Sequence, residues 1–411
     1  MRGDPWSVRF HLVRLVMVLS LVAPSACSPA PAVDPTTPGA SVLPEPSSTR
    51  RSAPPPGHEL YGFLPYWEMR DGITTHLRDT PLTTLALFSV THTPRGSLNE
   101  TQRGYRLITG DTGRTIIREA HDRGTRVELV YTSFGAKRNR ALFEDIGRQD
   151  RVIDALVALV DDTRTDGVNV DVEALDPMLV PAYGEFVRRL REAIRQADGQ
   201  DEVSAATGAG ALGAAMAAAA ASAGAARIFL MGYDYRVAGS SPGASAPLDR
   251  SDGGDRSLRW SLDMYAALGV PPERLLLGLP LYGMVWPVAG PALGAPATGR
   301  GEAWIPARNA GVVTDESAAA QRDGVEQVDV YLQASDGSWG APSAGASLTP
   351  AELARTWTAV YVDSPATLAE KMRLANERGL AGSGFWAIGY ERGLPGYRAL
   401  MEAFVDGAPL R

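Results

Sequence analysis

The sequence contains very few residues of the kinds that build disulfides or metal centres, with one cysteine and five histidines among 411 residues. A single cysteine excludes an intrachain disulfide framework and any zinc site made of CxxC pairs. The histidines are scattered and form no HExxH motif, which argues against a zinc-dependent hydrolase of that type. We therefore expect neither a bound metal nor another cofactor.

An excess of positive charge is also missing, since 40 Lys and Arg residues stand against 47 Asp and Glu residues and give a net charge of −7. This balance gives no reason to expect nucleic acid or an anionic membrane surface as a partner. A hydrophobic fraction of 45% is ample for a large core. The length allows roughly two or three ordinary domains, but one (β/α)8 barrel can also fill about 200 to 400 residues.

The N-terminal segment has the composition of an export signal. Three arginines precede an apolar run at residues 15–23, and these nine residues are too few to span a bilayer. We predict a signal peptide over residues 1–26 and hence an extracytoplasmic protein. Cys27 follows directly, and the arrangement resembles a bacterial lipoprotein signal, in which this cysteine is lipidated and anchors the chain to the membrane. An ordinary secretory signal with an incidental cysteine is the alternative.

A proline-rich stretch separates this signal from the rest of the chain. Residues 28–57 contain nine prolines, many Ser and Thr residues and almost no large apolar side chains. Such a stretch cannot bury enough surface to offset its ordering entropy, so residues 27–57 are predicted to form an extended tether. The folded domain is then expected over residues 58–411.

From residue 59 onward, short apolar runs with strand propensity alternate with helical patterns. Helix starts are marked by Asp176-Pro177 and Ser364-Pro365, each of which places an N-cap residue before a proline at the first helical position. Alternation of this kind predicts a parallel sheet covered by helices. Eight strands are predicted, at residues 60–67, 82–90, 126–131, 167–173, 203–206, 227–233, 275–280 and 384–388.

Eight strand–helix units favour an α/β fold of the (β/α)8 TIM-barrel type. An open Rossmann-like sheet is the alternative, but no GxGxxG follows the first strand. Residues 284–356, between the seventh and eighth strands, are too many for a simple connection. They are predicted to form a small α+β insertion that contains a strand at residues 328–332.

The fourth strand, DGVNVDVE at residues 166–173, places its polar and apolar side chains on opposite faces. Its three valines suit packing against helices, whereas Asn169, Asp171 and Glu173 would point into the barrel, where unpaired polar groups are costly. Glu173 ends the strand, at the end of a barrel where enzymes build their active sites. A half-exposed edge strand with one wet face would explain the same pattern without a function.

Motifs on four other predicted strands decide between these interpretations. They are YGFLPYW at residues 61–67, MGYD at 231–234, GLPLYG at 278–283 with a trailing Trp286, and GFWAIG at 384–389. Together with DGVNVDVE, their order along the chain resembles that of the family 18 glycoside hydrolases, which include chitinases. Asn169 stands where that family's motif DGxDxDxE has an aspartate. The altered form resembles the branch that contains bacterial cell-wall and spore-cortex hydrolases and chitobiase-like enzymes.

The resemblance implies a substrate-assisted, retaining hydrolysis of glycosidic bonds. Glu173 would be the general acid, and Asp171 would orient the acetamido nitrogen of the substrate. Tyr233 would hydrogen-bond the acetamido oxygen, which attacks the anomeric carbon. The residues implied to bind the sugar are Asn169, Asp234, Trp386, Met231, Trp67, Tyr282 and Trp286.

The implied partner is an oligosaccharide or polysaccharide that contains β-linked N-acetylglucosamine, bound by a monomer. Peptidoglycan, chitin oligomers and N-glycans all satisfy this description, and the sequence leaves the choice open, as it does that between endo and exo cleavage. A lectin-like glycan-binding protein of the same fold is the alternative to an enzyme. The presence of Glu173 together with Asp171 and Tyr233 argues against it.

Overall fold

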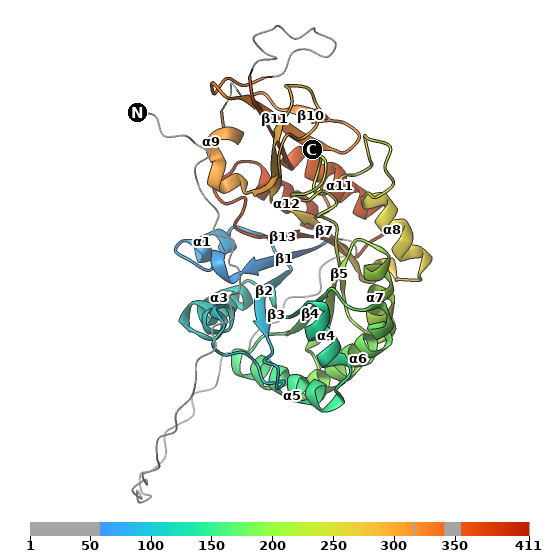
Figure 1. Cartoon of the computed structure of the whole chain (residues 1–411). Helices are drawn as coiled ribbons and strands as arrows, with labels where there is room; N and C mark the ends of the chain where they lie inside the picture. Colours follow the sequence, from blue (N-terminus) through green and yellow to red (C-terminus); the bar gives the residue numbers. More distant parts are fainter. Residues whose placement is uncertain (1–57, 316–317, 341–354, 411) are drawn as a thin grey trace, which may run out of the picture. The chain divides into compact units, whose positions relative to one another are not determined.

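The computed structural model describes residues 58–315, 318–340 and 355–410 (Figure 1). The predicted signal peptide (residues 1–26), the predicted tether (residues 27–57) and the proposed lipidation site Cys27 lie outside the described residues. None of the helices in the described ranges is long and apolar enough to cross a membrane.

Eight parallel strands form a closed barrel, which confirms the predicted (β/α)8 fold. Each predicted strand overlaps one of the observed ones. The sixth strand ends two residues earlier than predicted, because the chain leaves the sheet and Asp234 takes a left-handed backbone conformation with φ of 60°. The barrel strands are β1 (Glu59–Pro65), β2 (Thr84–Thr91), β3 (Arg126–Phe134), β4 (Gly167–Glu173), β5 (Glu202–Gly208), β6 (Ile228–Met231), β7 (Leu275–Pro280) and β13 (Gly382–Trp386).

Helices cover the outer face of the barrel, and Figure 1 shows α3, α5, α6 and α7 following one another around it. The predicted start at Asp176 is confirmed as a 3-10 turn whose N-cap side chain accepts from Met178 N over 3.1 Å, with α6 directly behind it. Ser364 and Thr367 form a capping box at the start of α11. The helices are α1 (Ile73–Arg78), α2 (Arg103–Thr109), α3 (Asp111–Asp122), α4 (Ala136–Phe143), α5 (Ile146–Thr163), α6 (Val180–Ala197), α7 (Ala211–Ser222), α8 (Leu258–Ala267), α9 (Ala310–Val313), α11 (Pro365–Glu377) and α12 (Tyr397–Val405).

The interior of the barrel is packed largely with aromatic rings. Phe229 of β6 lies 4.8 Å from Phe63 of β1, measured between ring centroids. The neighbouring strands β7 and β13 carry Gly278 and Gly384 beside this ring. A Cβ atom on Gly278 would lie 2.3 Å from the Phe229 ring, and one on Gly384 would lie 2.7 Å from it. Glycine at these two positions therefore makes room for the aromatic packing of the interior.

The insertion between β7 and β13 is a five-stranded antiparallel sheet in the order β10-β11-β12-β8-β9. The predicted strand at residues 328–332 is confirmed as β11. The predicted boundaries 284–356 are too narrow at the C-terminal end, because β12 pairs with both β11 and β8 inside this sheet. Its strands are β8 (Gly283–Val288), β9 (Glu302–Trp304), β10 (Gln321–Asp323), β11 (Val328–Ala334) and β12 (Trp357–Val362).

A buried ion pair ties the insertion to α11, the helix that precedes the last barrel strand. Asp363 directly follows β12, and Lys371 of α11 donates to its Oδ1. The two side chains are only 4% and 0% exposed, so each charge depends on the other for its solvation. Removing either partner alone would leave an uncompensated buried charge. The intact pair therefore fixes the position of β12 relative to α11.

Candidate active site

The polar side chains of β4 lie where the alternation of the strand predicts. Val168, Val170 and Val172 belong to the core between the barrel and its helices. On the other face, Asn169 is 0% and Asp171 3% exposed, whereas Glu173 is exposed at the carboxyl end of the strand.

The end of β4 is held in place by the segment that follows β3. Gly135 N donates to the backbone oxygen of Glu173 over 3.1 Å, and Asn139 Nδ2 of α4 donates to the same oxygen over 2.6 Å. The next residue, Ala174, has a left-handed φ of 58°, so the chain turns sharply away beyond Glu173. These contacts fix the direction in which the Glu173 side chain leaves the barrel.

The two carboxyl groups of β4 both have pKa values above the ordinary range. Burial raises the pKa of Asp171 well above its usual value, and the nearby charge of Glu173 raises it further. Glu173 is exposed as a residue, yet the surrounding atoms partly desolvate its carboxyl and raise its pKa, and the charge of Asp234 raises it further. Such a pair keeps a proton at a pH where isolated carboxyls are ionised, which suits a general acid.

The segment after β6 contributes Tyr233 and Asp234. Burial raises the pKa of the Tyr233 hydroxyl well above 10, and the charges of Asp171, Asp234 and Glu173 raise it further, so this group stays protonated and can donate. Tyr282, which follows β7, donates its hydroxyl to Asp234 Oδ1. The rings of Tyr233 and Tyr282 lie 6.2 Å apart and nearly perpendicular.

The insertion anchors this segment. Glu326, in the turn between β10 and β11, is 1% exposed and accepts from Ala244 N over 2.8 Å. It also forms an ion pair with Arg236, at 3.2 Å. Ser245, next to this anchor, accepts from Asp234 N over 3.1 Å. The insertion therefore helps to fix the position of Asp234 relative to the barrel.

Aromatic side chains gather near the carboxyl ends of β13, β1 and β2, in a cluster against which Tyr233 also packs. The Trp386 ring lies 4.8 Å from Phe88 and 6.3 Å from Trp67, with both contacts edge to face. Phe88 in turn stacks on Phe134, at 6.4 Å. Trp67 is fixed by a hydrogen bond of 3.0 Å from its Nε1 to the hydroxyl of Tyr390. Apolar rings of this kind can support the face of a sugar ring.

The structure brings most of the predicted site residues together, with one correction. Glu173, Asp171, Tyr233 and Asp234 interact electrostatically, and Tyr282 contacts Asp234. Asn169 lies beneath them, and Met231, Trp67 and Trp386 border the interior cluster. The prediction for Trp286 is wrong, because its ring is 0% exposed in β8, packed against Tyr361 in the insertion, and has no face to offer to a sugar.

Sequence reasoning missed several residues that the structure adds to this region. Phe134 is 42% exposed at the end of β3, next to Phe88. It was not predicted as a site residue because the predicted strand stopped at residue 131. Glu128 and Ser204 lie in the barrel interior and are at most 3% exposed. A charged residue at an inward position of the apolar strand β3 was the available signal for Glu128.

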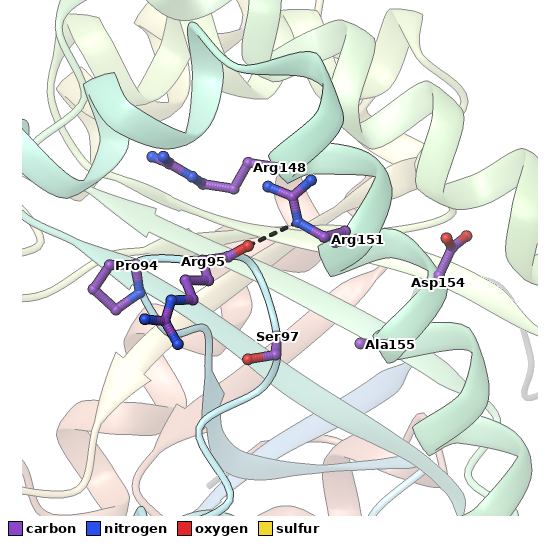
Figure 2. A pocket seen from close by; sticks show the side chains of 7 residues that line it. All are labelled: Pro94, Arg95, Ser97, Arg148, Arg151, Asp154 and Ala155. Carbon is purple, nitrogen blue, oxygen red and sulfur yellow. Dashed lines mark hydrogen bonds between the residues drawn. The ribbon is translucent and has the colours of Figure 1, made fainter. Parts of the chain in front are cut away.

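A separate hollow of about 930 Å³ lies between α5 and the connection from β2 to α2. Figure 2 shows Arg148 and Arg151 on α5 and Arg95 on that connection, with Arg151 Nε donating to the Arg95 backbone oxygen over 2.8 Å. None of the predicted site residues lines this hollow.

Within the described ranges, there is no group of three or more His, Cys, Asp or Glu side chains that could hold a metal ion.

Known proteins match this chain in sequence. The family model described as glycosyl hydrolases family 18 matches residues 107–391. A class V chitinase, CHIT5, of Lotus japonicus is 29% identical over 147 residues, which span 33% of this chain and only 30% of that protein.

Solved structures resemble the barrel at low sequence identity, so this likeness shows a shared fold and nothing more. A family 18 chitinase of Cycas revoluta in complex with (GlcNAc)3 aligns with a TM-score of 0.67 and 19% identity, covering 85% of this chain and 99% of that chain. The spore cortex-lytic enzyme SleL of Bacillus cereus aligns with a TM-score of 0.63 and 18% identity, covering 84% of this chain and 74% of that chain.

Proposed function

The chain belongs to glycosyl hydrolase family 18, and we propose that it hydrolyses glycans containing β-linked N-acetylglucosamine, with Glu173 as the general acid. The observation that carries this proposal is the placement of Glu173 at the carboxyl end of β4, next to Asp234 and directly above the buried carboxyl of Asp171. An acid at this position can protonate the leaving oxygen of a sugar bound across the end of the barrel.

The nucleophile in this proposal is the acetamido group of the substrate itself, as in other substrate-assisted glycosidases. Asp171 receives the acetamido N–H and balances the positive charge that forms on the ring when the acetamido oxygen attacks. The hydroxyl of Tyr233, which stays protonated, donates to that oxygen and aligns it with the anomeric carbon. Trp386, partly buried between Phe63 and Phe88, offers an apolar floor beneath the reacting sugar.

The chitinase and cortex-lytic relatives support two polymers, chitin and cell-wall glycan. We expect the purified protein to release the fluorophore from chitobiose or chitotriose glycosides. Product analysis on chitin oligomers and on purified peptidoglycan, side by side, then identifies the preferred polymer. Oligosaccharide binding at micromolar concentration without any turnover would contradict the proposal and identify the protein as a lectin.

We further propose that the enzyme acts outside the cytoplasm, on the basis of the arginines, apolar segment and cysteine in residues 1–27. Lipidation of Cys27 would hold the barrel at the membrane by the tether. The full chain produced in a bacterium should then fractionate with membranes, whereas Cys27→Ser should be released, and Ser48→Ala in the tether should behave as the wild type. Equal fractionation of the wild type and Cys27→Ser would contradict lipidation.

A further inference from the structure

The hollow beside α5 concentrates positive charge on a chain whose overall charge is negative (Figure 2). Arg95, Arg148 and Arg151 line it, and Asp154 is the only carboxylate among the described residues that do so. The one hydrogen bond drawn in Figure 2 joins two of the arginines, and Asp154 pairs with none of the three. The hollow therefore carries an excess of positive charge.

The three guanidinium groups keep hydrogen-bond donors that no protein group uses. Among the described residues, the Arg95 guanidinium has no partner, and Arg151 uses only its Nε, which donates to the Arg95 backbone oxygen. Arg148 donates from Nη1 to the Ala141 backbone oxygen over 2.6 Å and lies 3.4 Å from the Asp145 carboxylate, but its buried Nε has no partner. A guanidinium group has five N–H donors, so donors remain for a ligand.

The turn that carries Arg95 is built to lie close against α5. Thr93 N donates to the Ser97 backbone oxygen over 2.7 Å and closes the turn. Gly96, inside the turn, has a φ of 94°, and a Cβ atom there would lie 3.0 Å from the Arg148 backbone oxygen. Glycine at this position therefore allows both the left-handed conformation and the close approach that bring the arginines of the turn and the helix together.

The positive charge of this region acts on a neighbouring side chain. His92 directly follows β2, and burial, together with the charges of Arg138 and Arg148, lowers its pKa to about 4. The charge of Arg148 has this effect although the Asp145 carboxylate lies beside it. Arg148 and Arg151 also lie in the first two turns of α5, where the helix dipole is itself positive. An anion in the hollow would be attracted by both sources of potential.

The hollow lies at the same end of the barrel as Glu173. The turn follows directly after β2, and the parallel strands of the barrel place this point at their carboxyl ends. α5 ends at Thr163, just before β4 begins, so its first turns lie at the carboxyl ends as well. A volume of about 930 Å³ holds an organic substituent rather than a single small ion. A polymer bound across this end of the barrel can place a side group there.

On the basis of the proposed function, we propose that this hollow binds carboxylate groups carried by the glycan, which favours an acidic cell-wall glycan over neutral chitin as the polymer that the enzyme cleaves. Peptidoglycan carries carboxylates on its lactyl ether and peptide substituents, whereas chitin carries none. A planar guanidinium group pairs with a carboxylate through two parallel hydrogen bonds. Arg95 and Arg151, which have the most unused donors, are the main contacts.

Binding to purified peptidoglycan, freed of phosphate-containing polymers, tests this site. One portion keeps its carboxyl groups and another has them amidated, so the two portions differ in charge but not in their sugars. The parent protein is the full chain with Glu173→Gln, which leaves the polymer intact during the measurement. We expect the parent to bind the amidated portion about three to ten times more weakly, the change that loss of two exposed ion pairs produces.

The double variant with Arg95→Gln and Arg151→Gln should bind the untreated portion as weakly as the parent binds the amidated one. It should also lose most of its sensitivity to amidation, because the variant and the chemical treatment remove the two halves of the same contact. Arg95→Gln alone breaks no contact within the described residues and should lose part of this sensitivity.

Arg118→Gln is the matched control for the loss of an arginine. Arg118 is exposed in the second half of α3 and, among the described residues, has no hydrogen-bond or ion-pair partner. α3 ends just before β3 begins, so Arg118 lies toward the opposite end of the barrel. This variant should keep the full sensitivity to amidation.

Equal binding of both portions by the parent, or equal sensitivity to amidation in the parent and the double variant, would overturn the inference. Binding through the arginines that is found only before the phosphate polymers are removed would also overturn it and identify phosphodiesters as the ligand. A wild type that cleaves neither chitin oligomers nor peptidoglycan, while the arginines still account for the effect of amidation, would instead contradict the proposed function and leave the carboxylate site standing.

Discussion

Substitution of Glu173 by glutamine should lower kcat for a chitotriose glycoside by about 10³, within the range of about 10² to 10⁴ that positioned acid–base catalysis supplies. Glutamine has nearly the same shape as glutamate, but its amide cannot deliver a proton to the leaving oxygen. The Glu173 side chain is exposed, and Gly135 and Asn139 hold its backbone oxygen rather than its carboxyl. KM and the melting temperature should therefore stay close to those of the wild type.

The pH dependence of kcat/KM provides a second part of this prediction. Partial desolvation by the surrounding atoms and the charge of Asp234 both raise the pKa of Glu173, so the acid keeps its proton to a higher pH than an isolated glutamate, whose pKa is about 4.3. Activity should fall as the pH rises through the raised pKa. Asp234→Asn removes a repelling charge, so it should move this basic limb to lower pH. A limb that stays in place would contradict the assignment of Glu173.

Glu202→Gln is the matched control for the acid. Glu202 is an exposed glutamate at the first residue of β5, and in a parallel barrel this places it at the end opposite to Glu173. Kinetics and pH profile should remain those of the wild type. Glu173 would be ruled out as the acid if Glu173→Gln kept the activity of the wild type. The same would follow if Glu202→Gln lost as much activity as Glu173→Gln.

The barrel could be predicted from the sequence because its signals are local. Most strands are short apolar runs between helical patterns, and on β4 the alternation of valines with polar residues already separated the two faces. The C-terminal boundary of the insertion was harder to predict from the sequence. Residues 357–362 read equally well as a lead into the last strand, and only their pairing with β8 and β11, far apart in sequence, assigns them to the insertion.

The carboxylates of the site were also predictable, whereas the residues around them were only partly so. Trp286 follows a strand motif and was expected near the sugar, but its position in β8 buries it in the insertion. Glu128 and Ser204 come from strands without a recognised motif. The hydrogen bonds that join Asn169 to Ser204 and Ser204 to Glu128 form only in the closed barrel, where β3 and β5 both flank β4.

The second large effect should come from the substrate rather than from the protein. Fully deacetylated glucosamine oligomers should be cleaved at least about 10³ times more slowly than N-acetylated oligomers of the same length, because an intramolecular nucleophile is lost and its effective concentration is very high. Neither Asp171 nor Asp234 is well placed to replace it. Asp171 is 3% exposed, and burial raises the pKa of Asp234, whose Oδ1 already accepts a hydrogen bond from Tyr282. Product formation measured at saturating concentrations of both oligomers separates slow chemistry from weak binding. Equal rates would mean that a carboxylate attacks or activates water, and loss of that activity in Asp234→Asn would then identify Asp234 as the group responsible.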